Sequence, residues 1–306
     1  MIEPTHPDAV APERSRWISS NGIRLRVHEW GDPEATPILL CHGMFDHGRG
    51  FDLLAPRLAE RFRVLALDAR GHGESGWADS YPWPMDVFDI VNVLGELGRP
   101  AHLFGHSKGG GQAIDAALTA PERVIKLIDF DGFGPPDEKG FKGPLGSEMP
   151  DLSTPEFCGL FLDRRRRASE RGGWKAYPSF DALVERRGEQ NPRLPKDWLR
   201  YFVFHAAIES EDGWRWKADP HFSSGGFGPF KAAWIGPQWK HLQPPLLAVV
   251  GGVPDVWGPI PEDTLAARLS VVPTLERATV EDAGHFVHME QPAESARLIL
   301  DFLADG

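Results

Sequence analysis

The residue with the clearest chemical potential is Ser107, which stands in the sequence Gly105-His106-Ser107-Lys108-Gly109. An apolar segment precedes it and a helical pattern, Lys108–Ala120, follows it, so the serine lies at a predicted strand-to-helix turn. Glycine at both flanking positions suits so sharp a turn, because a side chain there would clash with the strand or the helix. The turn also aims the first helix N–H groups at the point where an oxyanion would form. The pattern predicts a nucleophilic serine, with an inert glycine-rich turn as the alternative.

A serine hydroxyl is a weak nucleophile at neutral pH, so it needs a histidine base and a carboxylate that orients this base. We expect His285 to be the base, because it follows a predicted strand at a loop glycine and can reach the carboxyl edge of the sheet. Asp255, in the loop after the strand Leu246–Gly251, is the expected acid. Asp131, at the end of the strand that follows the serine, is the alternative acid, and a turn-forming aspartate before Gly132 is its non-catalytic interpretation.

Three other histidines are interpreted as structural. His42 is expected to shape the loop after a strand, His106 to lie wedged under the serine turn, and His288 to be packed or hydrogen-bonded. The histidines and the two cysteines do not have the spacing of a metal-binding set, and no glycine-rich phosphate loop follows a strand. The sequence therefore predicts no metal and no cofactor.

The elements that must position these residues alternate between strand and helix. Asn21-Gly22 predicts the tight turn of a hairpin near the start of the chain. Predicted strands follow at 37–41, which is apolar throughout and typical of a buried strand, and at 64–68, 102–105, 124–131, 246–251 and 275–280, with helical patterns between them. This alternation predicts an α/β fold, a mostly parallel sheet with helices on both faces.

The alternation breaks in the middle of the chain, where proline and glycine are frequent. We therefore expect residues 16–132 and 244–306 to form the core, residues 133–243 to be an inserted helical cap, and residues 1–15 to be a flexible N-terminal arm. The cap segment holds more than half of the chain's aromatic residues, which either build its own small core or line a pocket.

Five motifs in this order resemble the α/β-hydrolase family over nearly the whole chain. They are Cys41–Met44, Leu67–Ser75, Gly105–Gly109, Gly252–Asp255 and Gly284–Pro292. The resemblance implies an eight-stranded sheet with a cap. In this family the first motif forms the oxyanion loop, the third the nucleophile elbow, the fourth carries the acid and the fifth the histidine.

The resemblance also implies that the backbone N–H groups of Met44 and Lys108 form the oxyanion hole. Lys108 departs from the family, which usually has an apolar or aromatic residue after the serine. Its backbone can still donate. Its ammonium group is expected to pair with Asp46 or another carboxylate, with contact to an acidic substrate as the alternative.

Composition limits the partners. The chain has 306 residues and a net charge of −11, which disfavours nucleic acid and anionic membrane surfaces. No apolar segment approaches the length of a membrane span. Two cysteines are too few for a disulfide framework, so a cytoplasmic location is expected. The expected protein is a monomer or homodimer with a small-molecule substrate.

The expected function is that of a serine hydrolase that cleaves a small apolar or aromatic carboxylic ester or lactone through an acyl-enzyme, with Phe45 and Trp83 as pocket candidates. A carbon–carbon bond hydrolase or a cofactor-free perhydrolase with the same triad is the alternative. A ligand-binding receptor on a hydrolase scaffold is the alternative from another class.

Overall fold

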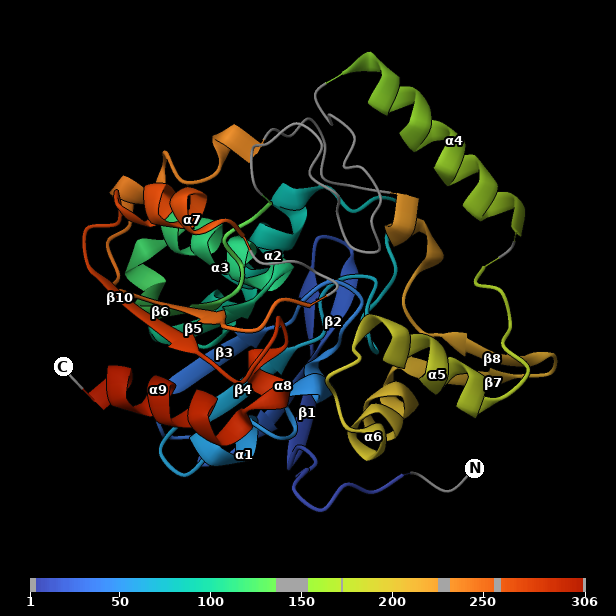
Figure 1. The fold of residues 1–306 in the computed structure, drawn as a ribbon, viewed down its shortest axis with the longest axis horizontal. Coiled ribbons are helices and arrows are strands. Elements are labelled where there is room, and N and C mark those ends of the chain that lie inside the picture. Colours follow the sequence, from blue (N-terminus) through green and yellow to red (C-terminus); the bar gives the residue numbers. More distant parts are fainter. Residues whose placement is uncertain (1–3, 136–153, 172, 225–231, 256–259, 305–306) are drawn as a thin grey trace.

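The computed structural model describes residues 4–135, 154–171, 173–224, 232–255 and 260–304, and it centres on one eight-stranded sheet (Figure 1). The strand order is β1-β2-β4-β3-β5-β6-β9-β10. The strands are β1 (Arg14–Ser20), β2 (Ile23–Trp30), β3 (Pro37–Cys41), β4 (Arg63–Leu67), β5 (Ala101–His106), β6 (Val124–Phe130), β9 (Leu246–Gly251) and β10 (Leu275–Val280). The pairs β1–β2 and β2–β4 are antiparallel and the other pairs are parallel, which confirms the predicted fold class.

The predicted hairpin joins β1 and β2. Asn21 and Gly22 have φ values of 44° and 80°, the left-handed conformation that this turn requires and that asparagine and glycine tolerate best. The first strands therefore form where the local sequence favours them most strongly.

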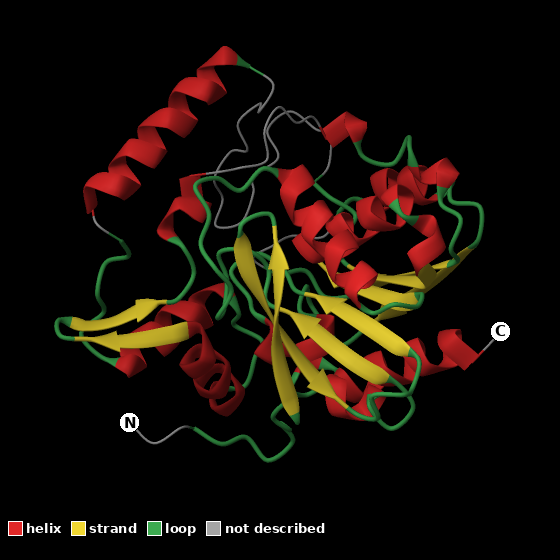
Figure 2. Ribbon diagram, turned by 180° about the vertical axis from the view of Figure 1, so that it is seen from behind, coloured by secondary structure: helices red, strands yellow, loops and turns green. Residues whose placement is uncertain are grey.

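Helices cover both faces of the sheet (Figures 1 and 2). On one face lie α2 (Trp83–Glu96), α3 (Lys108–Thr119) and α7 (Glu262–Leu269), and on the other lie α1 (Ala55–Leu58), α8 (Val287–Glu290) and α9 (Pro292–Ala304). In β3, Leu39 belongs to the first core whereas Ile38 and Leu40 belong to the second. Because successive side chains point to opposite faces, a strand buried on both sides is apolar throughout, as the sequence showed.

The insertion between β6 and β9 contains helices, as expected, and also one small sheet. The elements among its described residues are α4 (Pro155–Arg171), α5 (Phe180–Gln190), α6 (Lys196–Ala206), β7 (Ala207–Ser210), β8 (Gly213–Trp216) and three short 3-10 helices (Pro220–Ser224, Ala232–Trp234 and Trp239–His241). The antiparallel pair β7–β8 was not predicted, because strands of four residues are too short for an alternation of apolar and polar residues to be recognised.

Short segments complete the fold. The helix expected after β3 is divided between a 3-10 turn, Gly48–Phe51, and α1, and a second 3-10 turn, Pro121–Arg123, precedes β6. The described part of the expected N-terminal arm lies against the body, where the indole N–H of Trp30 donates to the carbonyl oxygen of Val10 at 2.9 Å. Within the described ranges, no helix has both the length and the apolar character that crossing a bilayer requires.

Candidate active site

Ser107 occupies the turn between β5 and α3, with a φ of 54° and a ψ of −122°, a conformation that costs energy for a residue with a side chain. A Cβ atom on Gly105 would lie 2.4 Å from the carbonyl oxygen of Gly109. One on Gly109 would lie 2.5 Å from the carbonyl oxygen of Cys41 at the end of β3. Both glycines of the motif are thus required by close backbone contact. The N–H of Ser107 donates to the carbonyl oxygen of Phe130 at 2.9 Å, which ties the elbow to β6.

The predicted base lies beside this elbow. His285 follows β10, and its carbonyl oxygen accepts a hydrogen bond from Nε2 of His106 at 2.9 Å. The two imidazole rings are 4.8 Å apart between centroids. The residue directly before the serine therefore contacts His285, although 179 positions separate the two histidines in the sequence.

Two aspartates approach His285 in different ways. Oδ2 of Asp131 lies 3.7 Å from the ring nitrogen Nδ1, whereas Oδ2 of Asp255 accepts a hydrogen bond from the backbone N–H of His285 at 2.7 Å. The backbone holds Asp131 in place, since its N–H donates to Val249 at 3.0 Å and the N–H of Gly251 donates to its Oδ2 at 3.3 Å. The ring thus faces the residue predicted as the alternative acid, and the predicted acid contacts the main chain of the histidine.

The electrostatics of the pair favour a positively charged imidazole. Burial alone lowers the pKa of His285, but the close and negatively charged Asp131 carboxylate outweighs it, with smaller contributions from Asp255 and Asp46, so that the pKa is raised above 6.5. Burial raises the pKa of Asp131, and His285 opposes this effect. An imidazolium is the state that forms when histidine takes the proton of a serine, so the site stabilises this step.

The loop after β3 is shaped by a neutral histidine. Nδ1 of His42 lies 2.7 Å from the carbonyl oxygen of Gly43, and Nε2 accepts a hydrogen bond from the N–H of Ala69 at 3.0 Å. A carbonyl can only accept, so Nδ1 carries the proton and Nε2 does not. Burial also lowers the pKa of His42, which keeps the ring neutral.

The two expected oxyanion donors are backbone groups at this loop and at the elbow. In the described part of the chain, the N–H of Met44 donates no hydrogen bond. Lys108 is the first residue of α3, where a helix leaves its N–H without an intrahelical acceptor. The two segments lie close together at Gly43, where an added Cβ atom would be 3.2 Å from Cβ of Ser107.

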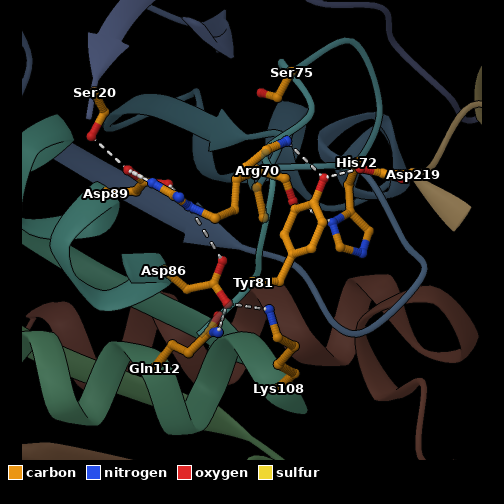
Figure 3. A network of polar contacts seen from close by, with 12 residues as sticks. Ser20, Arg70, His72, Ser75, Tyr81, Asp86, Asp89, Lys108, Gln112 and Asp219 are labelled. Carbon is orange, nitrogen blue, oxygen red and sulfur yellow. Dashed lines mark hydrogen bonds and ion pairs between the residues drawn. The ribbon is translucent and has the colours of Figure 1, made fainter. Parts of the chain in front are cut away.

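The side chain of Lys108 belongs to a buried polar network (Figure 3). Its ammonium group donates to Oδ2 of Asp86 at 2.7 Å, and the amide of Gln112 donates to the same oxygen at 2.8 Å. Arg70 lies 4.0 Å from the other oxygen of Asp86 and pairs with Asp89 at 2.6 Å. Two buried cations thus face two buried carboxylates, which balances their charges. The predicted ion pair of Lys108 therefore forms with a carboxylate of α2.

Aromatic rings of the inserted segment contact Phe45 in the loop after β3. The ring of Phe45, one of the two predicted pocket residues, lies 5.4 Å from that of Phe222 and 6.2 Å from that of Trp174. Trp83, the other pocket candidate, packs beside α3, and its indole N–H donates to Asp115 at 2.7 Å. Phe45 thus stands between core and cap, whereas Trp83 contacts the flank of the elbow helix.

The remaining histidines near the elbow are buried and packed. The ring of His288 lies 4.4 Å from that of His106 and 5.1 Å from that of Phe51. Burial lowers the pKa of His106 well below 6.5 and that of His288 to about 3. Both rings therefore stay neutral in the physiological range and fit the structural roles expected for them.

A hollow of about 330 Å³ borders the histidine on the side of its carboxylates. Asp131, Asp255 and His285 line it together with residues of β9, β10 and α7. Within the ranges that the structure describes, no three histidine, cysteine or acidic side chains gather as a metal-binding set. The chemistry that the described residues offer is that of a serine, a histidine and a carboxylate.

Sequence reasoning missed two ion pairs that connect the inserted segment to the loop after β3 and to the loop that carries His285. Arg187 pairs with Asp46, and Arg193 pairs with Glu290 at 2.5 Å. Their carboxylate partners lie inside the motifs or next to them, but nothing in the sequence distinguishes Arg187 from the adjacent Arg186. Only the docking of the cap shows which arginine points inward.

Comparison with known proteins agrees with the observed fold. A sequence model of the alpha/beta hydrolase family matches residues 38–298. A serine hydrolase-like protein of Dictyostelium discoideum is 25% identical over 300 residues, which cover 92% of this chain and 79% of that protein. A 3-hydroxybutyrate-oligomer hydrolase of Cupriavidus necator is 37% identical over 120 residues, but this match spans only 37% of the chain and 41% of the relative.

Solved structures share the fold at low sequence identity. A thioesterase domain from the curacin biosynthetic pathway has a TM-score of 0.77 at 23% identity, with 94% of this chain and 99% of that chain covered. An esterase of Mycobacterium tuberculosis has a TM-score of 0.71 at 22% identity, with coverage of 96% and 93%. These likenesses extend over core and cap together.

Proposed function

The chain belongs to the alpha/beta hydrolase family and is a hydrolase, and from this premise we propose that it cleaves a small carboxylic ester through an acyl-enzyme on Ser107. The observation that carries the proposal is the position of His285. Its backbone contacts the residue beside the strained serine, and its ring faces a half-buried carboxylate 3.7 Å away. A histidine next to the serine turn with a carboxylate facing its ring supports an activated serine nucleophile.

In the proposed reaction, His285 takes the proton of Ser107 as the hydroxyl oxygen attacks the ester carbonyl. The N–H groups of Met44 and Lys108 stabilise the oxyanion of the tetrahedral intermediate. The imidazolium then protonates the leaving alcohol as the bond between the carbonyl carbon and the alcohol oxygen breaks. Water, deprotonated by His285, attacks the acyl-enzyme and releases the acid, which restores the free serine.

We assign the orienting carboxylate to Asp131, because its oxygen faces Nδ1 of His285. Asp255, which the sequence favoured for this role, holds the backbone of the same histidine through a 2.7 Å hydrogen bond. The attraction between opposite charges weakens with distance, so the aspartate that faces the ring stabilises the imidazolium most strongly. Asp255 then serves to place the histidine loop.

The surroundings support an apolar substituent on the substrate. Phe45 and Phe222 meet above the oxyanion loop, and the ammonium group of Lys108 is bound to Asp86 and lies 4.9 Å from the centre of the Phe222 ring. A cation already balanced by a carboxylate gives little attraction to an acidic substrate. The oligomer hydrolase of Cupriavidus necator, whose substrate name implies ester bonds between hydroxy acids, also supports an ester.

A panel of p-nitrophenyl esters and lactones of graded acyl length, assayed with the wild type and with Ser107→Ala, tests the proposal. We expect turnover of short or aromatic esters, and a loss of several orders of magnitude in Ser107→Ala with an unchanged circular dichroism spectrum. Near-wild-type turnover in the variant would refute the assignment of the nucleophile.

A further inference from the structure

The cap segment formed by α5 and α6 reaches the loop that carries the expected oxyanion donor. Arg187, at the end of α5, is buried with 3% of its surface exposed. Its guanidinium group donates to Oδ1 of Asp46 and, at 3.4 Å, to the carbonyl oxygen of Phe45. One side chain of the cap therefore holds two successive residues that directly follow Met44.

This loop needs an external support, because Phe45 has a φ of 59°. A left-handed conformation is unfavourable for a bulky side chain and persists only where surrounding contacts enforce it. The local backbone supplies only a weak turn, in which the N–H of Asp46 donates to Gly43 at 3.3 Å. The two hydrogen bonds from Arg187 add the support that this turn lacks.

The same arginine also contacts the histidine loop. Its guanidinium carbon lies 4.8 Å from the ring centre of Phe202 in α6 and 5.8 Å from that of Phe286, the residue after His285. Arg187 thus lies between the oxyanion loop and the histidine loop, and it contacts residues of both.

A second arginine of the cap holds the histidine loop directly. Arg193, between α5 and α6, donates to Oε2 of Glu290 at 2.5 Å and to the carbonyl oxygen of Asp282 at 2.7 Å. Glu290 accepts a hydrogen bond from the N–H of Gly284 at 2.9 Å through the same oxygen. The loop that presents His285 is therefore closed by its own glutamate, and Arg193 fixes this glutamate to the cap.

An apolar seam joins the same three segments. The third hydrophobic core contains residues of α5 and α6 together with Leu53, from the segment that follows the oxyanion loop, and Phe286 and Met289, from the histidine loop. Packing of this kind resists movement of the segments past one another, because protein interiors are close-packed and not easily compressed. In Figure 1, α5 and α6 lie beside the body of the protein, whereas α4 stands apart from it.

We propose that the α5–α6 segment is a fixed brace for both catalytic loops, in which Arg187 is a positioning residue for the oxyanion loop and Arg193 is a positioning residue for the histidine loop. The catalytic meaning of this brace rests on the proposed function, but its structural meaning does not. The cap then contributes to transition-state stabilisation as well as to the shape of the pocket, although neither arginine touches the reacting atoms.

The test compares Arg187→Met and Arg193→Met with a matched control, Arg186→Met, in the full-length chain. Arg186 precedes Arg187 on the same helix, is 41% exposed at its side chain and pairs with Glu189 within the cap. Amide hydrogen exchange is measured for peptides that cover 43–52 and 281–290. In parallel, the rate of modification of Ser107 by a fluorophosphonate and the values of kcat and KM are measured.

We expect Arg187→Met to accelerate exchange in 43–52 at least tenfold and to lower the phosphonylation rate and kcat by about tenfold to a hundredfold, with little change in KM. The reason is that the oxyanion exists only in the transition state, and loss of one donor costs about a hundredfold or more. Arg193→Met should accelerate exchange chiefly in 281–290 and shift the pH profile of kcat, because it loosens the histidine. Arg186→Met should change none of these quantities.

Unchanged exchange in both loops of the two variants would overturn the brace. So would accelerated exchange without any loss of kcat or phosphonylation rate in an active wild type. If the wild type is not modified at Ser107 but exchange responds as predicted, the proposed hydrolase chemistry fails and the structural brace stands. If Arg187→Met does not fold, Arg187→Lys serves in its place. Lysine keeps the positive charge opposite Asp46 but lacks the second guanidinium nitrogen, which donates to the carbonyl oxygen of Phe45.

Discussion

Replacing Asp131 by asparagine removes one negative charge beside the imidazole with almost no change in shape. Asp131 and His285 are 16% and 14% exposed at their side chains, and their charged atoms are 3.7 Å apart. At an effective dielectric constant of about 20, a charge pair at this distance is worth about 4.5 kcal/mol. Since about 1.4 kcal/mol corresponds to a factor of ten, we expect Asp131→Asn to lower kcat by about a thousandfold.

The comparison that decides the acid is Asp131→Asn against Asp255→Asn, with kcat/KM measured across pH 5 to 9 on the best ester of the panel. Asp255→Asn weakens one hydrogen bond to a backbone N–H, so a loss of about tenfold is expected. Asp131→Asn should also move the acidic limb of the profile to lower pH, because the carboxylate that raises the pKa of His285 is gone.

Asp129→Asn is the control, two positions earlier near the end of β6, where the side chain is fully buried. Burial raises the pKa of Asp129 well above its usual range, which favours the neutral carboxyl group that an amide resembles. We expect kcat to stay within a few-fold of the wild type. If Asp255→Asn cost a thousandfold and Asp131→Asn less than tenfold, Asp255 would be the orienting acid and our assignment would be wrong.

Three further predictions concern the same machinery. The kcat/KM of the wild type should fall as the pH decreases through a pKa above 6.5, because the base must be neutral and Asp131 stabilises its protonated form; a limb below pH 6 in steady-state rates would contradict this. Gly105→Ala should lower kcat at least tenfold, because the Cβ of the new alanine would meet the carbonyl oxygen of Gly109 at 2.4 Å. The control Gly159→Ala, on α4, should leave kcat unchanged, because a Cβ atom there meets open space. Asp86→Asn should destabilise the fold by about 3–5 kcal/mol in urea unfolding, because it leaves the buried ammonium group of Lys108 without an opposite charge, and a loss below about 1 kcal/mol would show that the network is not held by this pair.

The sequence sufficed for the parts of the molecule that local chemistry determines. The hairpin turn at Asn21-Gly22 needs residues that tolerate a positive φ, and the elbow around Ser107 needs glycines where the backbone comes close, so the pattern predicted both. The strands were recognisable because a doubly covered sheet needs continuous apolar segments, as in Pro37–Cys41. His285 could be predicted because it stands in the Gly284–Pro292 motif, shortly after the last strand of the sheet.

The orienting carboxylate could not be chosen from the sequence. Asp131 and Asp255 both follow parallel strands that end at the same edge of the sheet, and β6 and β9 are neighbours. Which carboxylate faces the ring depends on the path of the loops after these strands, and that path is set by tertiary contacts such as the hydrogen bond from Gly251 to Asp131. Spacing along the chain contains no information about such contacts.

The support from the cap was equally hidden. Arg187 and Arg186 are chemically identical neighbours, and only the packing of α5 on the body makes one of them buried and the other exposed. The sequence allows Asp46 as a partner of Lys108. In the structure, Asp46 pairs with Arg187 and Lys108 pairs with Asp86. Long-range ion pairs of this kind follow from the fold and do not precede it.

The most direct test of the account is rapid-quench mass spectrometry of the enzyme during turnover of a p-nitrophenyl ester. We predict that a peptide containing Ser107 gains the mass of the acyl group within the burst of nitrophenol release, and that the adduct disappears as hydrolysis proceeds. Steady turnover with no acyl mass on this peptide, or an acyl group on another residue, would contradict the assignment of Ser107 as the nucleophile.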